Sequence, residues 1–327
     1  MSTLGLFLLL VASDGGTVAR GGADGGFHHP VYVHCDNGHM QGSKQQLICT
    51  GHVRVKRNTA DITCEKLIAY YTNKDVNDMK HFECIGNVEA VDGDRWAASD
   101  FADYDNEKEV LVMTGHPRGR QGTSRLLGSK IIFHVNSDEM DVDNVTAVLE
   151  SQGQDDKRKA KKKKAPPSVA ASVAADAGSE GSFVNPVDVQ CDRGRMEGSK
   201  EQMVCVGNVH MKRHATDMTC ERLIAHYVNK DVNEVKRMEC TGNVEATDGD
   251  RWAKSDFADF DTSKEVLVMT GHPQGRQGSN DMTGSKITFY VDSDLMDVDN
   301  VIGVLEGKGQ DERRKANMKK AQGTQGK

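Results

Sequence analysis

The chain has 327 residues, of which 37% are apolar and 28% charged, with 33 glycines and a formal net charge of −7. Its longest apolar stretch, Leu4–Ala12, is too short to cross a bilayer, which takes about 20 residues, so a polytopic membrane protein is excluded. The acidic balance argues against a general nucleic-acid binder, which would carry an excess of Lys and Arg over a whole face.

The first 30 residues have the features of a weak export signal. Leu4–Ala12 fits the apolar core of a signal peptide, and Val11-Ala12-Ser13 offers small residues for cleavage. The positively charged start is missing, because Met1-Ser2-Thr3 contains no Lys or Arg. We therefore expect a weak or start-truncated signal peptide and leader over residues 1–30, and a mature chain that begins close to Ser13 or Asp14.

The remainder is dominated by an internal duplication. Val31–Glu150 aligns without a gap onto Val187–Glu306 at a constant offset of 156 residues. Both tryptophans, Trp96 and Trp252, and all eight cysteines obey this offset. The sequence thus predicts one domain written twice, over residues 31–153 and 184–309.

Within each copy the local period of the apolar residues is two, which is typical of half-buried strands. Leu47, Cys49, Val53 and Val55 alternate with polar neighbours, and Ile131, Phe133 and Val135 repeat the pattern. Asn37-Gly38, Gly86-Asn87 and Asp92-Gly93 are turn pairs. Glu65–Tyr71 could form two helical turns, but its β-branched residues favour extended chain. Runs ending in glycine recur three times in each copy, which predicts small stacked units, two facing sheets and a narrow apolar interior, either a jelly roll or a solenoid-like stack.

Two segments lack apolar periodicity, residues 154–183 between the copies and residues 310–327 at the end. Both are rich in Lys, Ala, Ser and Gly, which predicts a disordered linker and a disordered basic tail. The run Lys159–Lys164 could serve as a nuclear-targeting signal or bind phosphate groups, but a solvated, extended spacer is the preferred interpretation.

No sequence pattern indicates a catalyst, a cofactor or a metal site. The cysteines have no CxxC spacing, and of the histidines only His116 and His272 match between the copies, both in TGHP turns. An even number of cysteines permits disulfides, and stacking would bring Cys35 near Cys64 and Cys49 near Cys84. Small buried, unpaired cysteines are the preferred alternative. The same pairing in the second copy joins Cys191 with Cys220 and Cys205 with Cys240.

The order of motifs resembles a known family. TGNV, CERLIAHY, ECTGNVEA, WAKSDFADFD, KEVLVMTGHP and GSKITFYVDSDLMDVDN follow one another in the second copy, and near-identical segments do so in the first. This succession resembles the LptA/OstA-like family of periplasmic lipopolysaccharide-transport proteins. The resemblance covers Val31–Glu150 and Val187–Glu306, nearly everything outside the linker and the termini.

The resemblance implies an all-β chain with two tandem open-ended β-jelly-roll domains, without enzymatic activity. It implies a periplasmic protein that carries lipopolysaccharide or a related lipid in an apolar groove between the membranes, and that associates end to end with other jelly-roll transport proteins through edge strands. The alternatives are a structural or adaptor β-module with a filled core that recruits partners by edge-strand addition, and a basic-armed module that binds polyanions. The groove candidates are the apolar residues of the alternating pattern: Leu47, Val53, Val55, Ile62, Leu67, Val110, Val112, Ile131 and Phe133 in the first copy, and Met203, Val209, Met211, Met218, Leu223, Val266, Val268, Ile287 and Phe289 in the second.

Overall fold

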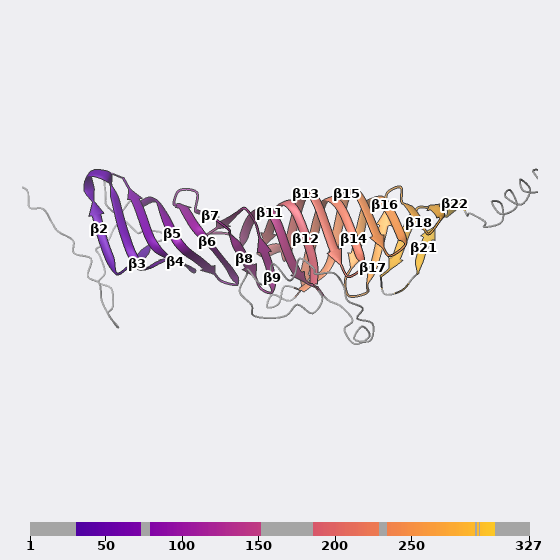
Figure 1. Ribbon diagram of the computed structural model, residues 1–327, viewed down its shortest axis with the longest axis horizontal. Coiled ribbons are helices and arrows are strands. Elements are labelled where there is room, and N and C mark those ends of the chain that lie inside the picture. Colours follow the sequence, from indigo (N-terminus) through magenta and orange to yellow (C-terminus); the bar gives the residue numbers. More distant parts are fainter. Residues whose placement is uncertain are drawn as a thin grey trace, which may run out of the picture.

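The computed structural model describes residues 31–72, 79–151, 186–228, 234–291, 293 and 295–304. These residues form strands joined by short turns, with two 3-10 helices of three residues each, η1 (Gly42–Lys44) and η3 (Gly198–Lys200). The strands are stacked side by side along the long axis of an elongated molecule, with β2 near one end and β22 at the other (Figure 1). The prediction of an all-β fold with almost no helix is confirmed.

In its described residues the first copy contains eleven strands. They are β1 (Tyr32–His34), β2 (Asn37–Gln41), β3 (Gln46–Arg57), β4 (Ala60–Tyr71), β5 (Met79–Asp92), β6 (Arg95–Asp105), β7 (Val110–Thr114), β8 (Arg118–Gln121), β9 (Ser124–Leu127), β10 (Lys130–His134) and β11 (Glu139–Glu150).

The part of the second copy that the structure describes also contains eleven strands, and it begins with one long strand where the first copy has β1 and β2. They are β12 (Pro186–Glu197), β13 (Gln202–Arg213), β14 (Thr216–Val228), β15 (Glu234–Asp248), β16 (Arg251–Asp261), β17 (Val266–Thr270), β18 (Gln274–Gln277), β19 (Asn280–Thr283), β20 (Lys286–Tyr290), β21 (Met296–Asp299) and β22 (Ile302–Val304).

The described strands pair antiparallel with one another, apart from one isolated parallel bridge between Ser151 and Val235, and β3 to β6 pair with their neighbours in two halves. The register shifts near the middle of the β3–β4, β4–β5 and β5–β6 ladders, and the β4–β5 ladder shifts a second time between Tyr70 and Tyr71. Where short strands follow, the halves separate: β6 pairs with β7 through Phe101–Asp105 and with β8 through 95–98. Inward side chains from both halves belong to one apolar cluster, so the halves enclose a common interior.

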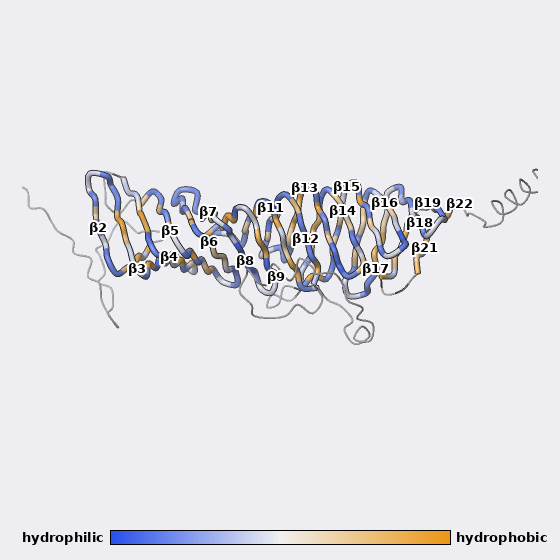
Figure 2. Tube along the Cα trace, viewed as in Figure 1, coloured by the Kyte–Doolittle hydropathy of each residue, from blue (hydrophilic) through white to orange (hydrophobic). Residues whose placement is uncertain are grey.

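The two-residue period places side chains as the sequence predicts in most of these strands. In β3, Val53 and Val55 are buried while Arg54 and Lys56 are exposed. Glu65–Tyr71 is extended chain within β4, and Asp92-Gly93 starts the turn between β5 and β6. The alternation of apolar and polar residues is visible along the strands of both copies (Figure 2).

Two of the predicted turns are wrong. Asn37 and Gly38 lie within β2, where they pair with Thr50 and Cys49. Gly86-Asn87 does not reverse the chain either, because it forms a bulge inside β5, with φ of +79° and +45°. A bulge needs the same left-handed backbone as a tight turn, so the residue types alone do not distinguish the two.

The two copies share one sheet. The last strand of the first copy, β11, pairs with the first strand of the second copy, β12, from Glu139↔Glu197 to Glu150↔Pro186. The buried apolar cluster likewise extends from Cys49 in the first copy to Phe289 in the second. The predicted leader, linker and tail lie outside the described residues.

Candidate lipid-binding interior

Most of the predicted groove residues line the shared interior. Val53, Val55 and Leu67 are each at most 1% exposed, and Leu47 is partly buried and packs against the apolar cluster that contains them. The same cluster contains Ile62, Ile131 and Phe133 in the first copy and Met203, Val209, Met211, Met218, Leu223, Ile287 and Phe289 in the second.

The predicted register is wrong in β7 and in its counterpart β17. Leu111 and Met113 are buried there, whereas Val110 and Val112 are half-buried on the outer side, and Val266 and Val268 repeat this arrangement. All four residues of the run are apolar, so their types do not reveal which face is inside. The pairing of Leu111 with the buried Tyr104 decides the register.

A sequence signal for the correct register was present. Cys49 and Cys84 are buried and lie two residues before Gly51 and Gly86. Met113 lies two residues before Gly115 and is buried as well. Counting back from each glycine therefore locates the inward residue.

One margin of the interior is closed by buried arginines, which no sequence pattern indicated. Arg213 is 1% exposed, lies 5.4 Å from the ring of Phe260 and donates from Nη2 to Glu265 Oε1 at 2.7 Å. In the first copy Arg57 lies over Tyr104 at 5.3 Å and pairs with Glu109. Each of these two arginines lies two residues after a buried apolar side chain of its strand, so it is on the inward face of that strand. Arg95 over Phe133 and Arg251 over Phe289 form two further pairs of this kind.

Glycine bulges beside carboxylates lie in β3, β5, β13 and β15, between β7 and β8, and between β17 and β18. At Gly86 a Cβ atom would lie 2.5 Å from a carboxylate oxygen of Glu65, and φ is +79°, so only glycine fits. Asn87 donates to Glu65 at 2.6 Å. The six bulges of this type are Gly51-His52 beside Asp36, Gly86-Asn87 beside Glu65, Gly115-His116 beside Asp100, Gly207-Asn208 beside Asp192, Gly242-Asn243 beside Glu221 and Gly271-His272 beside Asp256. The two TGHP histidines are therefore bulge residues, with Nδ1 2.9 Å from a carboxylate oxygen.

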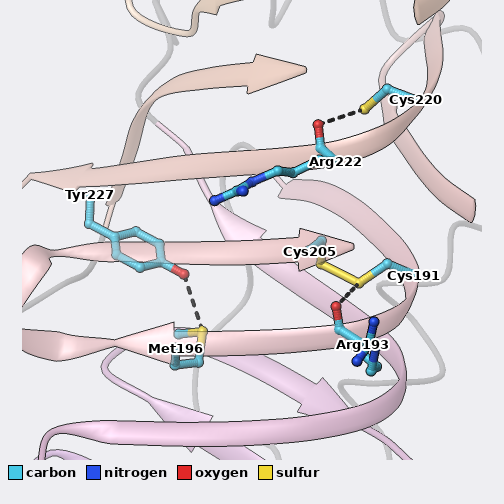
Figure 3. Close-up of a disulfide and its surroundings, with 7 residues drawn as sticks. All are labelled: Cys191, Arg193, Met196, Cys205, Cys220, Arg222 and Tyr227. Carbon is cyan, nitrogen blue, oxygen red and sulfur yellow. Dashed lines mark hydrogen bonds between the residues drawn. A yellow bond between two sulfur atoms is a disulfide. The ribbon is translucent and has the colours of Figure 1, made fainter. Parts of the chain in front are cut away.

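Three disulfides cross neighbouring strands next to these bulges. Cys191 is joined to Cys205 (Figure 3), and the other two bridges are Cys35–Cys49 and Cys220–Cys240. Their Cα atoms are 5.7 to 5.9 Å apart. Cys64 and Cys84 are buried and free.

The pairing predicted from the stacked units is wrong. Cys35 does not join Cys64, and Cys49 does not join Cys84, nor do their counterparts pair in this way. Equivalent places in successive units are two strands apart, which is about 9–10 Å. A disulfide needs Cα atoms within about 7 Å, so only adjacent strands can be bridged. The preferred alternative, unpaired cysteine, describes only Cys64 and Cys84.

The interior continues across the junction of the copies. Val145 pairs with Cys191 and Ala147 with Val189, and all four side chains are buried.

On the outer face of the junction, Arg195 of β12 donates from Nε to Asp141 of β11 at 2.6 Å. Burial would raise the pKa of Asp141, but hydrogen bonds from Arg195 and His134 outweigh it and lower the pKa below its ordinary value.

Within the described ranges no three His, Cys, Asp or Glu side chains gather closely enough to hold a metal ion. The helices of that same part of the chain are all too short to span a membrane. The chemistry that the arrangement offers is therefore an enclosed apolar surface, bordered by buried ion pairs on one side and by carboxylate-paired bulges on another.

A known family matches both copies of the duplicated unit. The family described as LptA/(LptD N-terminal domain) LPS transport protein matches residues 32–139 and 188–295. The chain belongs to this family. Membership of this LptA-like family gives the protein a role related to lipopolysaccharide transport and places it in a class of non-enzymatic transport modules.

Among solved structures, the chain is similar to LptH, the LptA-homologous periplasmic component of the lipopolysaccharide transport device of Pseudomonas aeruginosa. The identity is 13% and the TM-score 0.34, over 37% of this chain and 96% of LptH. No curated protein matches the chain.

Proposed function

We propose that this LptA-like chain is a periplasmic protein that carries lipopolysaccharide, or a related lipid, along its apolar interior between the inner and outer membranes. The family match supports the transport role, and the resemblance of the motif order to periplasmic lipopolysaccharide-transport proteins supports the compartment. The amino-terminal segment, which we expect to direct export, lies outside the described residues.

The observation that carries this proposal is the continuity of the interior. A lipid that moves along the molecule must not meet a polar barrier where the copies join. Buried pairs such as Val145↔Cys191 and Leu149↔Val187 keep the junction apolar on its inner side. Acyl chains gain about 0.8 kcal/mol per buried methylene group, so an uninterrupted apolar surface favours their retention.

Photo-crosslinking tests whether the interior holds lipid. A photoreactive residue at Val53 should capture lipopolysaccharide in the full chain, whereas one at Arg54, on the exposed face of the same strand, should not. Val209 and its neighbour His210 provide the same contrast in the second copy. Capture at neither inner position, in folded protein with lipid present, would contradict lipid carriage.

That negative outcome would support the alternative, an adaptor with a filled core. The observation in its favour is the close packing of the inner side chains, including the stacked rings of Phe82 and Tyr104 with centroids 4.9 Å apart. Equal capture at Val53 and Arg54 would instead show that the assigned faces are wrong, since a one-residue slip exchanges them.

The partners we propose are other jelly-roll transport proteins that add to the free end strands. Seven large apolar side chains are well exposed among the described residues, and five of them lie at the two ends: Tyr32, Met40, Leu295, Val301 and Ile302. The β11–β12 junction gives the register of such a contact. Within the chain, Met140 of β11 pairs with Met196 of β12. Their counterparts at the offset of 156 are Met296 and Met40, so Met296 at the end of one molecule would pair with Met40 at the start of the next. Exposed apolar edges of this kind are suited to strand addition.

A further inference from the structure

Cys64 and Cys84 are the two cysteines of the chain that the structure leaves unpaired. They are the counterparts, at the offset of 156, of Cys220 and Cys240, which form a disulfide. The flanking residues agree, because both copies read Thr-Cys-Glu at the first cysteine and Glu-Cys at the second. The free pair therefore has a bridged reference inside the same molecule.

The backbone around the two pairs has the same register. Cys64 lies opposite Val53 and Cys220 opposite Val209, while Cys84 lies opposite Leu67 and Cys240 opposite Leu223. The same register shift separates them, between Thr63 and Lys66 in one copy and between Thr219 and Arg222 in the other. The bridged pair has its Cα atoms 5.9 Å apart, within the range that a disulfide requires.

The side chains also have the same orientation and burial. The sulfur of Cys64 lies 3.3 Å from the carbonyl oxygen of Lys66, and the sulfur of Cys220 lies 3.3 Å from that of Arg222 (Figure 3). Cys64 and Cys220 are each 6% exposed, and both Cys84 and Cys240 are fully buried. A rotamer change is thus not needed for the free pair to reach the geometry of the bridged one.

From this identity of register, orientation and burial we infer that Cys64 and Cys84 are a redox-active pair that forms a fourth cross-strand disulfide. The bridge joins β4 to β5 beside the Gly86 bulge, and it gives both copies two bridges at equivalent places. The inference is independent of lipid carriage, since it rests on the strand pairing alone.

The two thiols have different parts in the reaction. A hydrogen bond from Cys84 lowers the pKa of the Cys64 thiol, whereas the same hydrogen bond, together with burial, raises the pKa of the Cys84 thiol. Cys64 is also the more accessible of the two. Because the thiolate is the nucleophile in disulfide exchange, Cys64 reacts first.

With oxidised glutathione as the oxidant, the Cys64 thiolate attacks one sulfur, forms a mixed disulfide and releases one glutathione thiolate. Cys84 then loses its proton, and its sulfur attacks the Cys64 sulfur and expels the second glutathione thiolate. The protein loses two electrons and two protons, and one glutathione disulfide becomes two glutathione thiols.

Peptide mapping of the full chain tests the inference. The protein is incubated with oxidised glutathione, unfolded with an alkylating reagent present, digested without reductant and analysed by mass spectrometry. We expect a peptide containing Cys64 linked to one containing Cys84, with Cys220–Cys240 as the reference bridge in the same sample. Alkylated Cys64 and Cys84, or either residue linked to a different cysteine, would overturn the inference whatever the state of the reference.

A matched pair of variants tests the order of attack. In folded Cys84→Ser protein, Cys64 should retain one glutathione as a mixed disulfide, and in folded Cys64→Ser protein Cys84 should retain none. Mixed disulfide at Cys84 alone would show that the assigned roles are reversed and would overturn that part of the inference.

Discussion

A valine substitution at Gly194 should weaken the junction between the copies, and the same substitution at the equivalent Gly38 should not. A Cβ atom on Gly194 would lie 2.8 Å from Cγ2 of Val145, which is buried and cannot move aside easily because it is β-branched. Around Gly38 no atom lies within 4 Å of the added Cβ.

The expected magnitude follows from two opposing effects. Replacing a glycine within a strand removes backbone entropy from the unfolded chain and stabilises by about 0.5–1 kcal/mol at either position. Overpacking against Val145 costs about 1–3 kcal/mol and applies to Gly194 alone. Gly194→Val should therefore lower the free energy of unfolding by about 1–2 kcal/mol, while Gly38→Val leaves it unchanged or slightly raises it.

Equilibrium unfolding in urea gives the two changes in stability, and hydrogen exchange of the β11 and β12 amides shows whether the loss is local to the junction. Equal effects of the two substitutions would refute the reasoning, since only the contact with Val145 distinguishes them.

The Gly38→Val variant also tests the end-to-end association of two chains. If two chains associate in the register of the β11–β12 junction, Val301 of one chain lies beside Gly38 of the next chain. Val145 lies beside Gly194 in the same way within one chain. Gly38→Val should thus abolish concentration-dependent association in sedimentation velocity without loss of stability. Unchanged association of this variant would refute the proposed register.

Three further outcomes are expected. Leu111→Ala should destabilise by about 2–5 kcal/mol and Val112→Ala by less than about 1, and the reverse order in urea unfolding would show that the β7 register is wrong. Burial alone would raise the pKa of Asp261, but hydrogen bonds from Lys264 and Ser263 lower it to about 2. This carboxylate should therefore add about 1–2 kcal/mol of stability above pH 4 that is lost as the pH falls through 2, and Asp261→Asn should remove that part of the acid dependence of Tm. Glu265→Gln should cost about 3–5 kcal/mol because it leaves the charge of Arg213 buried, whereas joint replacement of both residues by apolar ones should cost much less in the same assay.

The sequence predicts the inside and outside of a strand where apolar and polar residues alternate. In β3 this placed Val53 inside and Arg54 outside correctly, because only one face of the strand is apolar. In β7 both faces carry apolar residues, so the alternation alone does not show which face is inside, and the position of Met113 two residues before Gly115 and the pairing of Leu111 with Tyr104 are needed to fix the register.

The long-range features required knowledge of which strands are adjacent. The disulfide partners could not be deduced from the repeat, because residues in equivalent places of successive units are separated by an intervening strand. Arg213 and Glu265 are 52 residues apart, so a buried ion pair between them has no local signature. The pairing of β11 with β12 has no local sequence signature either, because each copy has two end strands and either of them could have paired with the other copy.

The two copies belong to one continuous polypeptide, joined by residues 152–185, and this has a consequence for assembly. Two separate subunits that met through β11 and β12 would form the contact only above a certain protein concentration. On one chain the second copy is held near the first at an effective concentration that can reach the millimolar range, set by the reach of residues 152–185. This pair of units therefore forms at any dilution and in a fixed stoichiometry, and only the two outer ends remain subject to mass action.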